Sequence, residues 1–233
     1  MKRRIKHVTV LGSGIMGSGI AAHFANIGVE VLLLDIVPFE LTEAEQKKGL
    51  TKEDKAVRNR IATESLAKLV KASPALLYKK EFAERISVGN FDDDLQKIKN
   101  TDWIIEVVVE RLDIKKSVYE KIEQFRKPGT LVSSNTSGIP INMLVEGRSD
   151  DFKKYFAGTH FFNPVRYLPL LEIIPTNDTD AEIVKFYMEY GAKFLGKTTV
   201  LAKDTPAFIA NRIGVFSMMI CQKSKIQIGS SKW

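Results

Sequence analysis

The stretch VTVLGSGIMGSGI, residues 8–20, decides the fold of this chain. It begins inside Ile5–Leu11, a short apolar run that predicts a buried parallel strand. Ile15–Ile27 follows with helical periodicity, and Val29–Leu34 predicts a second strand that ends at Asp35. The beginning of the chain therefore predicts one strand–helix–strand unit.

The turn between the first strand and the helix follows the pattern G-x-G-x-x-G, and its residues are Gly12, Ser13, Gly14, Ile15, Met16 and Gly17. The first glycine permits a tight turn, the second lets a pyrophosphate approach the backbone, and the third lets the helix pack closely on the strand. Free N–H groups at the start of the helix point toward such phosphates. An empty fold with a chance glycine cluster is the alternative, but the flanking strand and helix favour a dinucleotide site.

Asp35 indicates which dinucleotide this site takes. It stands 23 residues after Gly12, at the end of the second predicted strand. A carboxylate at this place accepts hydrogen bonds from a ribose 2′-hydroxyl and repels a 2′-phosphate. The sequence therefore predicts NAD rather than NADP as the cofactor, bound by residues 12–17 and Asp35.

The rest of the chain alternates strand-like and helix-like segments. Further strands are predicted at Ile86–Val88, Trp103–Val109, Leu131–Val132, Tyr155–Phe162, Leu170–Ile174 and Thr198–Ala202. Helices are predicted at Leu112–Phe125 and Ala181–Phe194. This alternation predicts an α/β fold with a Rossmann-like, doubly wound and mostly parallel sheet.

A charged insertion interrupts the alternation at about residues 41–80. Leu41 to about Ser73 predicts two helices with a break near residues 49–51. From Lys47 to Lys80 there are ten Lys or Arg residues against three acidic ones. A solvated helix face and a site for a polyanionic ligand both explain this excess. Nucleic acid is disfavoured, because the basic residues lack interleaved aromatic side chains for stacking.

The composition is that of an ordinary globular protein, with 44% hydrophobic and 27% charged residues. No run reaches the roughly 18 apolar residues of a membrane helix, so we expect no membrane span. The single cysteine, Cys221, cannot form an internal disulfide, and we expect a cytoplasmic protein. His7, His23 and His160 are far apart in sequence, which disfavours a metal site.

Asp204-Thr205-Pro206 predicts a domain boundary, because it combines a helix start signal with a proline near the first turn. The apolar run Ala207–Ile220 would need a partner surface, and the tail from Lys223 to Trp233 supplies none. We therefore expect an NAD-binding domain at residues 1–203. Residues 204–233 would begin a helical domain that is largely absent from the chain.

His160 and Glu172 are candidates for proton transfer. His160 ends a largely apolar strand, where a histidine is often only a satisfied core residue. Glu172 lies within the apolar run Leu170–Ile174, where burying a carboxylate is costly unless something pairs with it. If the two strands are neighbours, the carboxylate can orient an imidazole that removes a hydroxyl proton. A salt bridge from Glu172 to a Lys or Arg is the alternative.

Several segments, in their order and approximate spacing, resemble the motifs of the 3-hydroxyacyl-CoA dehydrogenase family. They are Gly12–Gly17, Ser134–Ser137, Gly158–Pro164, Glu172 and Asp204–Arg212. The resemblance covers essentially residues 5–215. It implies an oxidoreductase of fatty-acid β-oxidation that converts L-3-hydroxyacyl-CoA to 3-oxoacyl-CoA with NAD.

The resemblance also implies roles for single residues in the reaction. It makes His160 the general base and Glu172 its orienting partner. Ser137 and Asn211 match polar positions near the hydroxyl and carbonyl oxygens of the substrate, and Ser137 also matches a position beside the cofactor.

Two further pairs of residues match binding positions of the family. Glu110 and Lys115 match positions near the nicotinamide and its ribose, with a surface ion pair as the alternative. Ser65 and Lys71 match positions in a helical hairpin that contacts CoA, whose phosphates suit a lysine-rich surface.

Gly49–Asp54, within the insertion, resembles the longer dehydrogenase portions of multifunctional β-oxidation proteins. This resemblance implies a native chain fused to an enoyl-CoA hydratase-type part, and the family implies a homodimer. Two rivals stay open. An NAD-dependent dehydrogenase of small hydroxyacids would need no basic insertion, and a non-catalytic dinucleotide-binding protein would not need His160 and Glu172.

Overall fold

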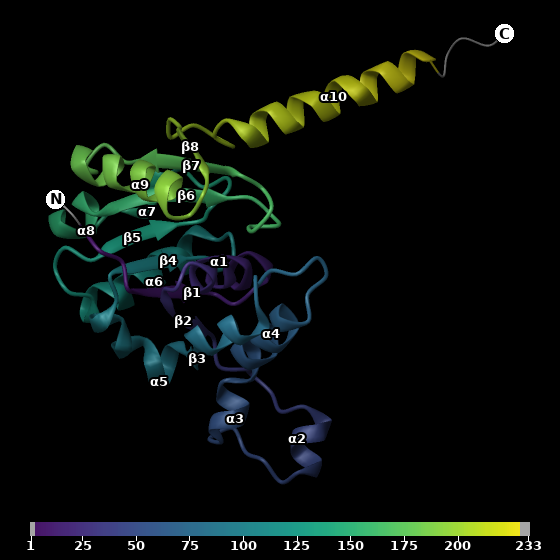
Figure 1. Ribbon diagram of the computed structural model, residues 1–233, viewed down its shortest axis with the longest axis vertical. Coiled ribbons are helices and arrows are strands. Elements are labelled where there is room, and N and C mark those ends of the chain that lie inside the picture. The colour runs from purple at the N-terminus through teal and green to yellow at the C-terminus, as the bar shows by residue number, and fades with distance from the viewer. Residues whose placement is uncertain (1–2, 229–233) are drawn as a thin grey trace.

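The computed structural model describes residues 3–228, and in this part of the chain eight strands form one sheet (Figure 1). The strand order is β3-β2-β1-β4-β5-β6-β7-β8. Neighbouring strands are parallel except β6 and β7, which pair antiparallel. The predicted α/β fold with a mostly parallel sheet is therefore confirmed, with one reversal toward the β8 edge.

The strands lie close to their predicted positions, with two differences at their ends. They are β1 (His7–Leu11), β2 (Glu30–Asp35), β3 (Ile86–Asn90), β4 (Trp103–Glu106), β5 (Leu131–Ser134), β6 (Phe156–Phe161), β7 (Leu170–Pro175) and β8 (Thr198–Leu201). β4 ends before Val109 because the Glu106 carboxylate accepts a hydrogen bond from Val108 N at 2.8 Å and turns the chain. β5 extends past Val132 because Ser134 still pairs with both neighbouring strands.

Helices cover both faces of the sheet, as a doubly wound fold requires. One face carries α1 (Ile15–Asn26), α4 (Arg60–Val70) and α9 (Ala181–Lys193). The other carries α6 (Leu112–Phe125), α7 (Ile141–Leu144) and α8 (Asp150–Lys154). Aromatic rings join helices to strands on each face. Trp103 packs edge-on against Phe24 of α1, with ring centroids 5.3 Å apart, and Tyr119 of α6 packs against Phe156 at 5.5 Å.

The insertion forms three helices instead of the two predicted, namely α2 (Glu43–Lys47), α3 (Lys55–Arg58) and α4. The predicted break near residues 49–51 lies between α2 and α3. The additional break is at Asn59, whose side-chain oxygen accepts a hydrogen bond from Asn90 Nδ2 of β3 at 2.6 Å. A long-range contact therefore interrupts a segment whose local pattern is continuous. Figure 1 shows α2 and α3 projecting beyond the β3 edge of the sheet.

Three short helical segments between β3 and β4, and just before β3, were not predicted. They are the 3₁₀ helices η1 (Lys80–Arg85) and η2 (Leu95–Asn100) and the single turn α5 (Phe91–Asp94). Segments of this length are too short to display a clear helical period, which is why the apolar pattern misses them.

The predicted helix start at Asp204 is wrong. The Asp204 carboxylate accepts hydrogen bonds from the backbone N–H groups of Ile141 and Asn142, at 2.8 and 2.9 Å. It therefore caps the start of α7, which lies more than sixty residues earlier in the chain. Ala207 and Phe208 then adopt left-handed φ values of 62° and 46°, which cannot continue into a right-handed helix.

The last helix, α10 (Ala210–Ile228), begins after this turn and extends beyond the predicted end at Ile220. It therefore enters the predicted tail, of which residues 229–233 lie outside the described residues. Figure 1 shows α10 running away from the sheet. Among the described helices, none combines the length and the apolar character that crossing a membrane requires.

Candidate functional site

A cavity of about 970 Å³ opens where the carboxyl ends of five neighbouring strands meet. Each strand contributes a lining residue at or just after its end, namely Gly12, Asp35, Val107, Asn135 and His160. β1 lies between β2 and β4, so the strand order reverses at the glycine turn, and ligands of open α/β sheets bind at such a switch point. A dinucleotide bound there would extend from β2 toward β6.

Gly12 and Gly17 are required by the close packing of the turn. Gly12 has a φ of +105°, and a Cβ on it would lie 2.5 Å from the carbonyl oxygen of Val107. A Cβ on Gly17 would lie 1.8 Å from the carbonyl oxygen of Gly12. A Cβ on Gly14, in contrast, would meet nothing within 4 Å, because the backbone there faces the cavity. The tight turn and the close helix packing predicted from the glycine spacing are therefore confirmed.

Asp35 is held by the glycine turn itself. Its Oδ2 accepts hydrogen bonds from the backbone N–H and the hydroxyl of Ser13, both at 2.6 Å. Its Oδ1 accepts one from Ile36 N at 2.7 Å. The carboxylate is half-buried and lines the cavity in this fixed orientation. Its predicted contact with a ribose hydroxyl is consistent with this geometry and stays a prediction.

A buried acidic residue that sequence reasoning missed lies under the β4 side of the cavity. Glu106 is fully buried, and its carboxylate accepts hydrogen bonds from Lys115 Nζ at 2.7 Å, Tyr119 OH at 2.7 Å and Ser134 Oγ at 2.6 Å. Burial, together with the charge of Glu106, raises the pKa of Tyr119 well above its ordinary value. One carboxylate therefore joins β4, α6 and β5 beneath the site.

Lys115 and Glu110 form an ion pair between a buried ammonium group and an exposed carboxylate. Lys115 is 1% exposed and its Nζ lies 3.3 Å from Glu110 as well as 2.7 Å from Glu106. Burial raises the pKa of Glu110, but the hydrogen bond from Thr136 and the charge of Lys115 outweigh it, so that the pKa is lowered. Both residues line the cavity. The surface alternative is therefore wrong for Lys115.

Glu110 also positions the loop that follows β5. Its Oε1 accepts hydrogen bonds from the Thr136 hydroxyl and, at 3.0 Å each, from the backbone N–H groups of Ser137 and Gly138. Ser137 is thereby presented at the cavity, where its side chain is exposed. The residues predicted on the nicotinamide side thus share one cavity wall.

His160 and Glu172 form the predicted pair. They are register partners in the antiparallel β6–β7 ladder, and His160 Nδ1 lies 2.7 Å from Glu172 Oε2. Both side chains are buried, and His160 lines the cavity. The salt bridge to Lys or Arg, the alternative for Glu172, is not the contact that forms. With Nδ1 held by the carboxylate, Nε2 is the ring nitrogen left to meet a substrate.

Asn211 reaches the same cavity from the first turn of α10. The second oxygen of Glu172 accepts hydrogen bonds from the backbone N–H groups of Ile209 and Ala210, at 3.0 and 2.8 Å. One carboxylate therefore holds both the histidine ring and the start of the helix that carries Asn211. The ring of Phe208 lies 5.6 Å from the His160 ring and packs against it edge-on.

The two residues expected to contact CoA differ in burial and in position. Ser65 is half-buried on α4, with its hydroxyl 3.1 Å from that of Ser13 in the glycine turn. Lys71 is exposed just beyond the end of α4. A CoA contact stays a prediction for both. Within residues 3–228, no group of His, Cys, Asp and Glu is arranged to hold a metal ion.

A strand, a glycine turn and a helix at the switch point, with an acidic residue that ends the second strand, define a dinucleotide-binding domain of the Rossmann class. The protein-family model named "3-hydroxyacyl-CoA dehydrogenase, NAD binding domain" matches residues 7–205 of this sequence. The chain belongs to the 3-hydroxyacyl-CoA dehydrogenase family. NAD is thereby the cofactor of this domain.

Curated relatives and a solved structure agree with this membership. Over 98% of its length the chain is 54% identical to a probable 3-hydroxyacyl-CoA dehydrogenase of Bacillus subtilis. Over 97% it is 39% identical to a putative fatty acid oxidation complex trifunctional enzyme of Rickettsia felis, and it covers 29% of the length of each relative. The structure of (S)-3-hydroxybutyryl-CoA dehydrogenase from Ralstonia eutropha has a TM-score of 0.68 and 30% identity, over 90% of this chain and 68% of that one.

Proposed function

We propose that this chain is the cofactor-binding and proton-transferring part of an oxidoreductase that converts L-3-hydroxyacyl-CoA to 3-oxoacyl-CoA in fatty-acid β-oxidation. The observation that carries the proposal is one cavity lined by both the glycine turn and His160, whose Nδ1 is 2.7 Å from the buried carboxylate of Glu172. A dinucleotide domain alone needs no such pair. A reaction that removes the hydroxyl proton of a substrate bound beside the cofactor needs a base of this kind.

The residues present fit NAD, because the open backbone at Gly14 suits a pyrophosphate and Asp35 suits an unphosphorylated ribose. Bound NAD supplies the acceptor for the hydride that leaves the substrate carbon. His160 is the general base: Nε2 removes the proton of the 3-hydroxyl group. Glu172 fixes the ring through Nδ1 and stabilises the imidazolium that results.

The remaining wall residues position the reacting groups. We assign Ser137 and Asn211 to the hydroxyl and carbonyl oxygens of the substrate, because both are polar and line the cavity with His160. We assign Glu110 and Lys115 to the nicotinamide side, because they lie beyond β4, on the opposite side of β1 from Asp35.

We propose an acyl-CoA rather than a small hydroxyacid as substrate, and its phosphates would meet the basic insertion with Ser65 and Lys71. The excess of basic residues from Lys47 to Lys80 supports this choice, since a small acid needs no such surface. We also propose a homodimeric, cytoplasmic whole protein with a fused enoyl-CoA hydratase-type part. The similarity to a trifunctional enzyme supports the fused part.

The substrate class is tested by following NADH oxidation with acetoacetyl-CoA and with free acetoacetate, in the full-length protein. We expect acetoacetyl-CoA to be used at least about 100-fold more efficiently, because binding energy from remote parts of a substrate raises kcat/KM. Equal efficiencies would favour the small-acid dehydrogenase. Failure of both substrates would contradict the reaction proposed.

A further inference from the structure

The carboxylate of Asp35, which we assign to the choice of cofactor, is in contact with two serine hydroxyl groups in series. Ser13 is 1% exposed, and its hydroxyl lies 2.6 Å from Asp35 and 3.1 Å from the hydroxyl of Ser65. A serine hydroxyl has one hydrogen, and the charged carboxylate at the shorter distance is the stronger acceptor. The Ser13 hydrogen therefore points to Asp35, and the Ser65 oxygen is a second acceptor within reach of the same hydroxyl.

Ser65 belongs to the insertion. Its helix must therefore be fixed relative to Asp35 for the contacts between Ser65, Ser13 and Asp35 to form. On α4, Ser65 shares a face with the buried residues Ala62 and Leu69, three and four positions away. That face packs toward α1 and places the Ser65 hydroxyl at the glycine turn.

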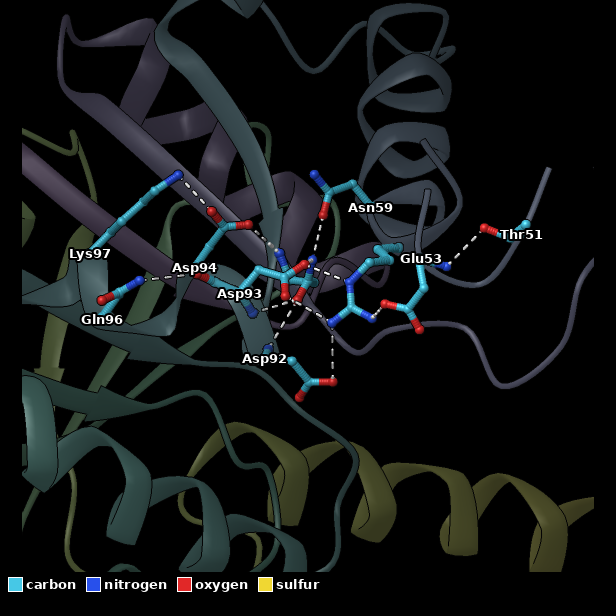
Figure 2. A network of polar contacts seen from close by, with 10 residues as sticks. Thr51, Glu53, Asn59, Asp92, Asp93, Asp94, Gln96 and Lys97 are labelled. Atoms are coloured by element: carbon cyan, nitrogen blue, oxygen red, sulfur yellow. Dashed lines mark hydrogen bonds and ion pairs between the residues drawn. The ribbon is translucent and has the colours of Figure 1, made fainter. Parts of the chain in front are cut away.

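A polar network at the start of α4 supplies a second anchor (Figure 2). Asn90 is 1% exposed, is the register partner of Asp35 in the β2–β3 ladder, and donates to Asn59 at 2.6 Å. Arg58 donates two hydrogen bonds to Asp93, at 2.7 and 2.8 Å. The helix that carries Ser65 is therefore tied to the strand beside Asp35 through its N-cap residue, Asn59, and to the glycine turn in its middle.

We propose that Ser13 and Ser65 are positioning residues that set the preference of this site for NAD over NADP. The proposal rests on NAD binding in the cavity described above. Ser13 occupies Asp35 Oδ2 with two donors and Ile36 occupies one side of Oδ1, which leaves the other side of Oδ1 for a ribose hydroxyl. The carboxylate cannot turn away from a 2′-phosphate without breaking these bonds. A carboxylate that has lost the hydrogen bond from the Ser13 hydroxyl can turn away from it.

The test measures the dissociation constants of NADH and NADPH by fluorescence titration of this chain. We expect Ser13→Ala to narrow the ratio of the two constants by about 3- to 10-fold and Ser65→Ala by about 2- to 3-fold, as expected when a hydrogen bond that orients a charge is lost. Ser65→Thr keeps the hydroxyl and should retain the ratio. Thr63→Ala, on the exposed face of α4, is the matched control and should leave it unchanged.

Asp35→Ala separates this proposal from the cofactor assignment. If Asp35→Ala keeps the preference for NADH, the assignment of Asp35 fails, and this proposal fails with it. If Asp35→Ala removes the preference, Ser65→Ala should have no further effect on the ratio in that background, because it acts through Asp35. An equal loss of NADH and NADPH affinity in the serine variants would overturn the proposal. So would a raised KM for acetoacetyl-CoA with an unchanged ratio.

Discussion

The two buried histidines of this protein, His23 and His160, have almost the same exposure, 3% and 5%, and different surroundings. His23 lies on α1, where Nε2 meets the carbonyl oxygen of Leu195 at 2.8 Å and Nδ1 is a buried atom without a hydrogen-bond partner in the described structure. His160 lies at the end of β6, where Nδ1 meets the Glu172 carboxylate and the ring lines a cavity. Both histidines are buried, but only His160 has a carboxylate partner and lines the cavity.

The difference concerns the charged form of the ring. Burial, together with the charge of Lys197, lowers the pKa of His23 to about 4, so this histidine stays neutral near pH 7. None of the groups that act on the His23 ring is a carboxylate, whereas the Glu172 carboxylate lies 2.7 Å from His160 Nδ1. A histidine on an apolar element therefore becomes a candidate base through the group that faces it.

The largest expected effect is on the reaction rate, when each of the two histidines is substituted in turn. His160→Gln should lower the rate of NADH oxidation with acetoacetyl-CoA by about 10²- to 10⁴-fold, because a positioned general base contributes about that much. His23→Gln, the matched control, keeps a donor for Leu195 and should leave the rate within about 2-fold of wild type. Steady-state kinetics of the full-length protein measures both. Similar losses in the two variants would remove the functional distinction between the histidines.

The next effect concerns stability in acid. Because the pKa of His23 is about 4 when folded and 6.5 in a free side chain, the unfolded chain binds more protons between these values. The free energy of unfolding should therefore fall as the pH falls from 6.5 to 4, by about 3 kcal/mol from this group. Urea denaturation at pH 7, 5.5 and 4 measures it. The fall should be smaller in His23→Gln by that amount, and an identical fall in both proteins would contradict the assignment.

How far the sequence predicts the site depends on whether a residue's partners are local. The glycine turn and Asp35 are encoded within one strand–helix–strand unit, so spacing alone locates them. His160 and Glu172 could be paired because an antiparallel ladder joins two neighbouring segments. Glu106 carried the same signal, a carboxylate within an apolar run, and was missed because its partners come from α6 and β5.

The two features that sequence reasoning placed wrongly also depend on distant contacts. Asp204 reads locally as the start of a helix, but its carboxylate is taken by the backbone of α7. The helix of the insertion reads as continuous through Asn59, but Asn90 of β3 interrupts it there. In both segments the local pattern predicted a helix, and tertiary hydrogen bonds decided where the helix begins.

The central claim is that His160 and Glu172 act as one unit, and a double-variant cycle tests it most directly. In the full-length protein, Glu172→Gln should lower kcat with acetoacetyl-CoA by about 10- to 100-fold, as expected for the loss of a hydrogen bond to a charged group. The same substitution in the His160→Gln background should cost almost nothing, because residues that act together are not additive. A full additional loss in that background would show that Glu172 acts independently of His160 and would contradict the account.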